Sequence, residues 1–153
     1  MSSQAQFFSR RAQECRVRVS VRSIAIRDGR LFLQRPTDEP ESCLAFIGGA
    51  LEHGELMEDR LMSEYSEEFG IVPVSVTYLF VVENRFEAGG GLIHGLEHYF
   101  EVELPGGEVV SREPDLTPVW VPLGDVASCD IRPHVVRDAI VDGTYRTVRR
   151  LAT

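Results

Sequence analysis

Seven acidic side chains lie between positions 52 and 68, out of 24 in the whole chain of 153 residues. They are Glu52, Glu55, Glu58, Asp59, Glu64, Glu67 and Glu68. Like charges three or four residues apart on a helix repel each other by roughly a few tenths of a kcal/mol per pair. A hard divalent cation such as Mg²⁺ or Mn²⁺ offsets that repulsion, because it prefers oxygen ligands. The cluster therefore indicates either a metal site or the solvated acidic face of a surface helix.

The spacing of apolar residues predicts a helix from about residue 56 to residue 69. Met57, Leu61, Met62, Tyr65 and Phe69 recur so that they fill one arc of this helix. At about 100° per residue, three of the glutamates share a neighbouring arc about 100° wide. These three are Glu64, Glu67 and Glu68. The helix is therefore expected to bring three carboxylates together at the edge of its buried face.

Glycines frame this helix at fixed distances. Gly70 suits the left-handed position that ends a helix, and Pro73 prevents the helix from resuming. The spacing over residues 49 to 71 resembles the Nudix box of the Nudix hydrolase family, Gly-x5-Glu-x7-Arg-Glu-U-x-Glu-Glu-x-Gly-U, in which U is a bulky aliphatic residue. The matching residues are Gly49, Glu55, Glu64, Glu67, Glu68, Gly70 and Ile71.

Two positions depart from the family pattern. Tyr65 stands where an aliphatic residue is usual, and a buried phenol needs a partner for its hydroxyl. Ser63 stands where the family has an arginine, which is understood to orient or balance a box glutamate. Arg60 lies one turn before Glu64, and its angle on the helical wheel falls between those of Glu67 and Glu64. We hypothesise that Arg60 takes over part of this ion-pairing role through its rigid guanidinium fork.

The resemblance implies a set of site residues. The carbonyl of Gly48 and the carboxylates of Glu64, Glu67 and Glu68 would bind the metal, and the same three glutamates would be catalytic. Glu64 is our first choice for the general base, and Gly49, Glu55 and Arg60 would support the site. Some family members use a later glutamate as the base, and Glu97 is the candidate for that role, although it reads equally well as an exposed strand residue.

Two further residues are weaker candidates for substrate binding. Arg85 follows Glu83-Asn84 and precedes Phe86, a mixture of charge and ring expected where a strand contacts a nucleotide. A strand that leaves the sheet for a turn explains the same residues. His53 lies in the loop of the box, close to the expected site.

The reaction that the resemblance implies is metal-dependent hydrolysis of a pyrophosphate bond, in a nucleoside diphosphate linked to another group. Mg²⁺ or Mn²⁺ is the implied cofactor, and a nucleotide-type small molecule is the implied partner. The alternative, motivated by Ser63, is a Nudix-fold module that binds nucleotide or metal with weak or no turnover. Substrates in the family include ADP-ribose, nucleoside triphosphates, sugar nucleotides, dinucleoside polyphosphates and capped RNA, and the box does not choose among them.

The elements around the box have their own signals. Residues 17 to 22 alternate apolar and polar, the alternation slips after Ser23, and Asp28-Gly29 predicts a two-residue hairpin to a strand over 31 to 35. Further strands are expected over 74 to 83, 92 to 104 and 119 to 121, followed by a helix with Pro133 in its first turn. Together with the resemblance, this order implies an α/β (α+β) fold over about residues 17 to 141, a Nudix-type α/β/α sandwich with a central mixed sheet.

Length and composition set the remaining expectations. We expect a lead-in segment over residues 1 to 15, to which no element is assigned, and a single domain over 16 to 153. The lead-in segment could take part in the interface of a homodimer. All 16 basic residues are arginine and the formal net charge is −8, which argues against stable binding to nucleic acid or to a membrane surface. Cys15, Cys43 and Cys129 lack zinc-site spacing, and with no signal-like segment they predict a cytoplasmic protein.

Overall fold

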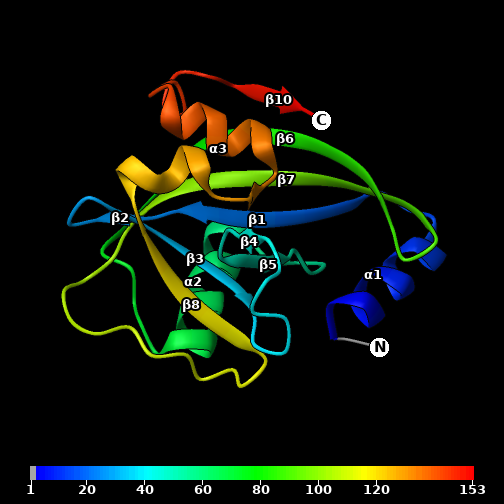
Figure 1. The fold of residues 1–153 in the computed structure, drawn as a ribbon, viewed down its shortest axis with the longest axis horizontal. Coiled ribbons are helices and arrows are strands. Elements are labelled where there is room, and N and C mark those ends of the chain that lie inside the picture. The colour runs from blue at the N-terminus through cyan, green and yellow to red at the C-terminus, as the bar shows by residue number, and fades with distance from the viewer. Residues whose placement is uncertain (1–2) are drawn as a thin grey trace.

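The computed structural model describes residues 3–153, and three α-helices and ten strands make up most of that range (Figure 1). In chain order the elements are α1 (Ser3–Glu14), β1 (Arg18–Ile24), β2 (Ile26–Arg27), β3 (Arg30–Pro36), β4 (Leu44–Ala45), β5 (Gly48–Ala50), α2 (Met57–Phe69), β6 (Ser75–Ala88), β7 (Gly91–Glu103), β8 (Leu116–Pro122), a short 3₁₀ helix η1 (Leu123–Ser128), β9 (Ile131–Arg132), α3 (His134–Val141) and β10 (Arg150–Ala152). Among these described residues no helix has both the length and the apolar character that a membrane crossing requires.

The strands form two sheets. The first has the order β10-β6-β7-β1-β5, with β1 parallel to β7 and antiparallel to β5. The second has the order β2-β3-β4-β9, and β8 pairs with β3. The predicted α+β fold with mixed sheets is confirmed, but the strands divide between two sheets instead of forming one central sheet. The division comes where the alternation slips, because β1 ends at Ile24 in the first sheet and β2 begins at Ile26 in the second.

Two local predictions about turns are confirmed. Asp28 has a φ of 52° and Gly29 a φ of 73°, the positive values that a two-residue turn between antiparallel strands requires, and β2 pairs with β3 across this turn. Gly70 ends α2 with a φ of 64°, and its N–H donates to the carbonyl of Ser66. The helix that carries the glutamates therefore stops where the sequence indicates.

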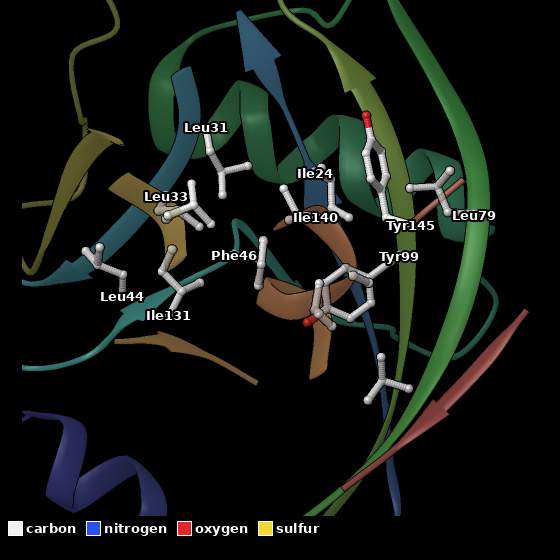
Figure 2. Packing of buried hydrophobic residues seen from close by; sticks show 14 of the residues in the cluster. Ile24, Leu31, Leu33, Leu44, Phe46, Leu79, Tyr99, Ile131, Ile140 and Tyr145 are labelled. Atoms are coloured by element: carbon white, nitrogen blue, oxygen red, sulfur yellow. The ribbon is translucent and has the colours of Figure 1, made fainter. Parts of the chain in front are cut away.

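Two clusters of buried side chains hold the layers together. The larger cluster joins β3, β7, β9 and α3, with side chains such as Leu33, Tyr99, Ile131 and Ile140 meeting between them (Figure 2). The second cluster lies under α2 and consists of Val21, Ala25, Phe32, Ile47, Leu61, Tyr65, Phe69, Phe100, Val102 and Leu104. The helices α2 and α3 consequently lie on opposite sides of the strands (Figure 1).

The structure adds several elements to those expected from sequence: helix α1, strand β10, the short strands β4, β5 and β9, and the 3₁₀ helix η1. Helix α1 occupies most of the segment expected to be a lead-in and packs against the far end of the β6–β7 hairpin, where the rings of Phe8 and Phe86 meet edge to face with centroids 5.5 Å apart. Strand β10 adds to the edge of the first sheet beside β6. Strand β10 has only three residues, too few for an alternating pattern to show, whereas the 12 residues of α1 carry an amphipathic pattern that the sequence analysis did not use.

Candidate active site

Two adjacent glycines bring the sheet edge close to helix α2. Gly48 and Gly49 lie in β5, opposite Arg22 and Val21 of β1. A Cβ atom on Gly48 would clash with the carbonyl oxygen of Val21, and a Cβ atom on Gly49 would clash with the carboxylate of Glu64. Glycine is therefore required at Gly48 for strand pairing, and at Gly49 it lets the carboxylate of Glu64 approach the backbone closely.

Buried residues of α2 fix which face of the helix meets that edge. Leu61, Tyr65 and Phe69 are buried against the second core cluster. The hydroxyl of Tyr65 is 2.6 Å from the Oγ of Ser23 on β1, so the phenol at this unusual position has the partner that its burial requires. With these side chains inside, Glu64 and Glu68 lie at the margin of the buried face.

Glu64 and Glu68 form a carboxyl pair at this margin. Burial, followed by the charge of Glu64, raises the pKa of Glu68 to about 8, and the two side chains share a hydrogen bond. Burial also raises the pKa of Glu64, although the hydrogen bond to Glu68 and the charge of Arg60 oppose this. The Oε2 of Glu68 is buried without a hydrogen-bond partner among the described residues. A pKa of about 8 means that Glu68 keeps its proton at neutral pH, as one of two crowded and partly buried carboxyls does.

Arg60 forms ion pairs with three carboxylates, one of which is that of Glu64. Its Nη1 is 3.3 Å from Oε1 of Glu55, and its Nη2 is 3.1 Å from Oε1 of Glu64 and 3.1 Å from Oε2 of Glu67. Partial burial works against its charge, but the carboxylates of Glu64, Glu67 and Glu55 outweigh it and raise the pKa of Arg60 above its ordinary value. The hypothesised ion pairs of Arg60 are thus present in the structure.

The glutamates predicted as metal ligands are not all together. Glu64 and Glu68 touch, whereas Glu67 is 63% exposed and turns to Arg60. Within residues 3–153 no three His, Cys, Asp or Glu side chains are grouped closely enough to hold a metal ion. The Glu64–Glu68 pair nonetheless suits a hard divalent cation, since it offers crowded oxygens, one of them buried and unpartnered, against the glycine-lined edge of β5.

The weaker candidates lie in other environments. Glu97 alternates with His98 along β7 and lies on the face that carries Tyr99, where it accepts hydrogen bonds from Asn84 (2.7 Å) and Tyr99 (2.9 Å). Phe100, on the other face, packs under α2. Arg85 and His53 are both exposed, Arg85 on β6 and His53 in the loop before α2.

Two features of the site were missed by the sequence analysis. Arg22 donates a hydrogen bond of 3.5 Å to the carbonyl of Phe46, and its charge lowers the pKa values of Glu64 and Glu68 against the effect of burial. The loop between β7 and β8 reaches the end of α2, where the backbone N–H of Arg112 donates to the carbonyl of Glu68 at 2.6 Å. Strand alternation gives Arg22 a face, but no local signal indicates what lies opposite that face.

The family model described as the NUDIX domain matches residues 16–140 of the chain. This protein belongs to the Nudix family. Among solved structures, the MutT NUDIX hydrolase from Burkholderia pseudomallei is 28% identical with a TM-score of 0.64, over 82% of this chain and 96% of that one. A MutT protein from Bacillus halodurans has a TM-score of 0.68 at 16% identity, over 88% of this chain and 85% of that one, which shows the Nudix fold alone.

A curated relative whose name states an activity matches only part of the chain. The ADP-ribose pyrophosphatase of Methanocaldococcus jannaschii is 29% identical over 92 residues, which are 60% of this chain and 53% of that protein. The chain thus spans about half the length of this relative. The proteins to which the chain is similar therefore include MutT proteins, one of them named a NUDIX hydrolase, and a protein named an ADP-ribose pyrophosphatase.

Proposed function

We propose that this Nudix protein is a divalent-metal-dependent pyrophosphohydrolase that cleaves a nucleoside diphosphate linked to another group. The observation that carries the proposal is the Glu64–Glu68 pair, whose pKa values are raised and whose Oε2 atom on Glu68 is buried without a partner. A protein that only needed a solvated helix face would leave these carboxyls exposed and apart. Crowded, half-buried carboxyls are typical of a functional site.

Glu64, Glu67, Glu68 and the carbonyl of Gly48 would hold Mg²⁺ or Mn²⁺. When bound, such an ion offsets the charge of a diphosphate and lowers the pKa of a coordinated water. Glu67 would join the pair by changing its side-chain conformation, since its side chain is 63% exposed and its carboxylate is bonded to Arg60. The residues present therefore fit the metal chemistry that the Nudix family typically uses.

The remaining steps fall to side chains of the protein. Glu64 is the candidate base for the attacking water, because its carboxylate lies against the backbone of Gly49 and is ordered by Arg60. Arg22 lies beside the carboxyl pair and presents a guanidinium fork that suits a phosphate of the substrate. Attack on phosphorus would then release two phosphate-bearing products.

The test is hydrolysis of a panel of substrates with Mg²⁺, followed by identification of the products. The panel contains ADP-ribose, nucleoside triphosphates, sugar nucleotides, dinucleoside polyphosphates and capped RNA. We expect turnover of at least one of these substrates. Glu64→Gln and Glu68→Gln should each lower the turnover rate by about 100-fold or more, the order of magnitude expected for loss of a catalytic carboxylate. Glu58→Gln, at an exposed position on the same helix, is the control and is expected to keep activity.

The panel also separates the enzyme from the alternative, a Nudix module that binds without turnover. If calorimetry shows saturable nucleotide binding and no substrate yields a product, the protein is a binding module and not an enzyme. Turnover unaffected by Glu64→Gln and Glu68→Gln would remove the assigned site while leaving the family membership intact.

A further inference from the structure

Arg60 gathers charges that would otherwise repel one another across two turns of α2. Its side chain is 13% exposed, and it reaches Glu64 one turn away, Glu67 two turns away, and Glu55 in the loop before the helix. Of these three carboxylates only Glu67 is largely exposed. A guanidinium with donors in a fixed fork can serve several carboxylates at once, which an ammonium cannot do in the same geometry.

This contact decides where the third carboxylate of the site lies. Glu64 is shared between Glu68 and Arg60, whereas Glu67 is bonded to Arg60 and stands apart from the carboxyl pair. Arg60 therefore serves as an internal counter-ion for these glutamates. Ser63 lies on the same side of the helix, three residues after Arg60, so an arginine there would face the same carboxylates.

We propose that Arg60 is a positioning residue: an internal counter-ion that holds Glu55, Glu64 and Glu67 in place before a divalent cation binds. Its effect on turnover rests on the proposed function, but its effect on the metal-free protein does not. Removal of Arg60 leaves three carboxylates, two of them partly buried, without their common cation. That loss is electrostatic, and either salt or a divalent cation relieves it.

The first experiment measures thermal unfolding without turnover. In EDTA, at pH 8 and low ionic strength, Arg60→Ala is expected to melt about 5 °C below the wild type, a shift in the range for a lost partly buried ion-pair network. Saturating Mg²⁺ should reduce the difference by at least half. Arg137→Ala is the control, since Arg137 lies on α3, is 21% exposed and pairs with Asp138 away from the site. Its melting temperature relative to wild type should not change with Mg²⁺.

The second experiment is rescue from the neighbouring turn. Arg60→Ala/Ser63→Arg should recover most of the lost melting temperature, whereas Arg60→Lys should recover less, because a compact ammonium does not span the positions that Nη1 and Nη2 of Arg60 reach. With an identified substrate, kcat of Arg60→Ala should fall at least 10-fold while KM changes less than three-fold, and the double variant should regain kcat.

Two results would overturn the proposal. One is an Arg60→Ala protein that melts with the wild type in EDTA. The other is a deficit that Mg²⁺ and Ser63→Arg both leave unchanged, which would make Arg60 a packing residue only. Absence of turnover in the wild type would instead count against the proposed function, and the melting experiments would still decide the role of Arg60.

Discussion

Glu68 holds its proton to a pH far above the ordinary value for a glutamate. Its pKa is about 8 in the folded protein, against 4.5 ordinarily, because of burial first and the adjacent Glu64 second. A raised folded-state pKa means that the folded protein binds more protons than the unfolded chain between these values, so stability is full below about pH 4.5 and falls as pH rises to about 8.

Glu68→Gln should remove this pH dependence. In EDTA the melting temperature of the wild type is expected to fall, relative to the variant, between pH 5 and pH 9, because glutamine stays neutral. Mg²⁺ at pH 8.5 should stabilise the wild type and have little effect on the variant. Calorimetric melting curves across this range measure both effects, with Glu58→Gln as the control, and parallel curves for wild type and Glu68→Gln would contradict the assigned pKa.

Tyr65 shows how a departure from the family pattern is accommodated. Its buried hydroxyl bonds to Ser23 at 2.6 Å, and Ser23 also donates to the carbonyl of Ile47 at 3.2 Å. Tyr65→Phe should therefore cost only about 1 kcal/mol of unfolding free energy, since Ser23 keeps a second partner. Urea titration measures this cost, and the double variant with Ser23→Ala should show coupling between the two substitutions. Additive costs would mean that the bond contributes nothing.

At the scale of elements, the two glycines of β5 have different roles: Gly48 matters for stability and Gly49 for the position of Glu64. A Cβ atom on Gly48 meets the backbone of β1, whereas a Cβ atom on Gly49 meets only the flexible end of Glu64. Gly48→Ala should lower the free energy of unfolding by about 3 kcal/mol, the upper end of the usual cost of overpacking, because the backbone of β1 cannot move aside. Gly49→Ala should displace Glu64 and lower turnover at least 10-fold with a smaller loss of stability.

Urea unfolding and turnover of the same two variants check this contrast. Gly106→Ala is the control, because a Cβ atom there meets nothing within 4 Å. Equal losses of stability in the Gly48 and Gly49 variants would mean that Glu64 is fixed as rigidly as the strand backbone.

Helix α2 also shows which part of the site can be predicted from sequence. Apolar periodicity and Gly70 predict the limits of the helix and the arc of its glutamates, because both depend on local geometry. The pairing of Glu64 with Glu68, and of Glu67 with Arg60, depends on side-chain conformations and on contact with β5. The position of Arg22 depends on strands far apart in the chain, so no local pattern contains it.

At the scale of the whole molecule, most strands followed from alternation and turn residues, while α1 did not. None of its residues belongs to either core cluster. It is attached through the Phe8–Phe86 ring contact, through Ala12 beside Gly91 and the backbone of Phe8–Ser9 beside Gly89, through an ion pair of Glu14 with Arg18 of β1, and through a 2.9 Å hydrogen bond between Gln4 and Ser42. Because an isolated helix of 12 residues is only marginally stable in water, α1 depends on these peripheral contacts.

Helix α1 should therefore open without unfolding of the rest of the protein. Its amides are expected to exchange with solvent at least 100-fold faster than those of α2, because local opening costs far less than global unfolding. Phe8→Ala should speed exchange in α1 further and shift the urea midpoint little, whereas Phe7→Ala, at a position 49% exposed, should do less. Hydrogen exchange by mass spectrometry resolves the two helices. Equal protection of α1 and α2, or a large fall in the midpoint of Phe8→Ala, would show that α1 unfolds together with the core.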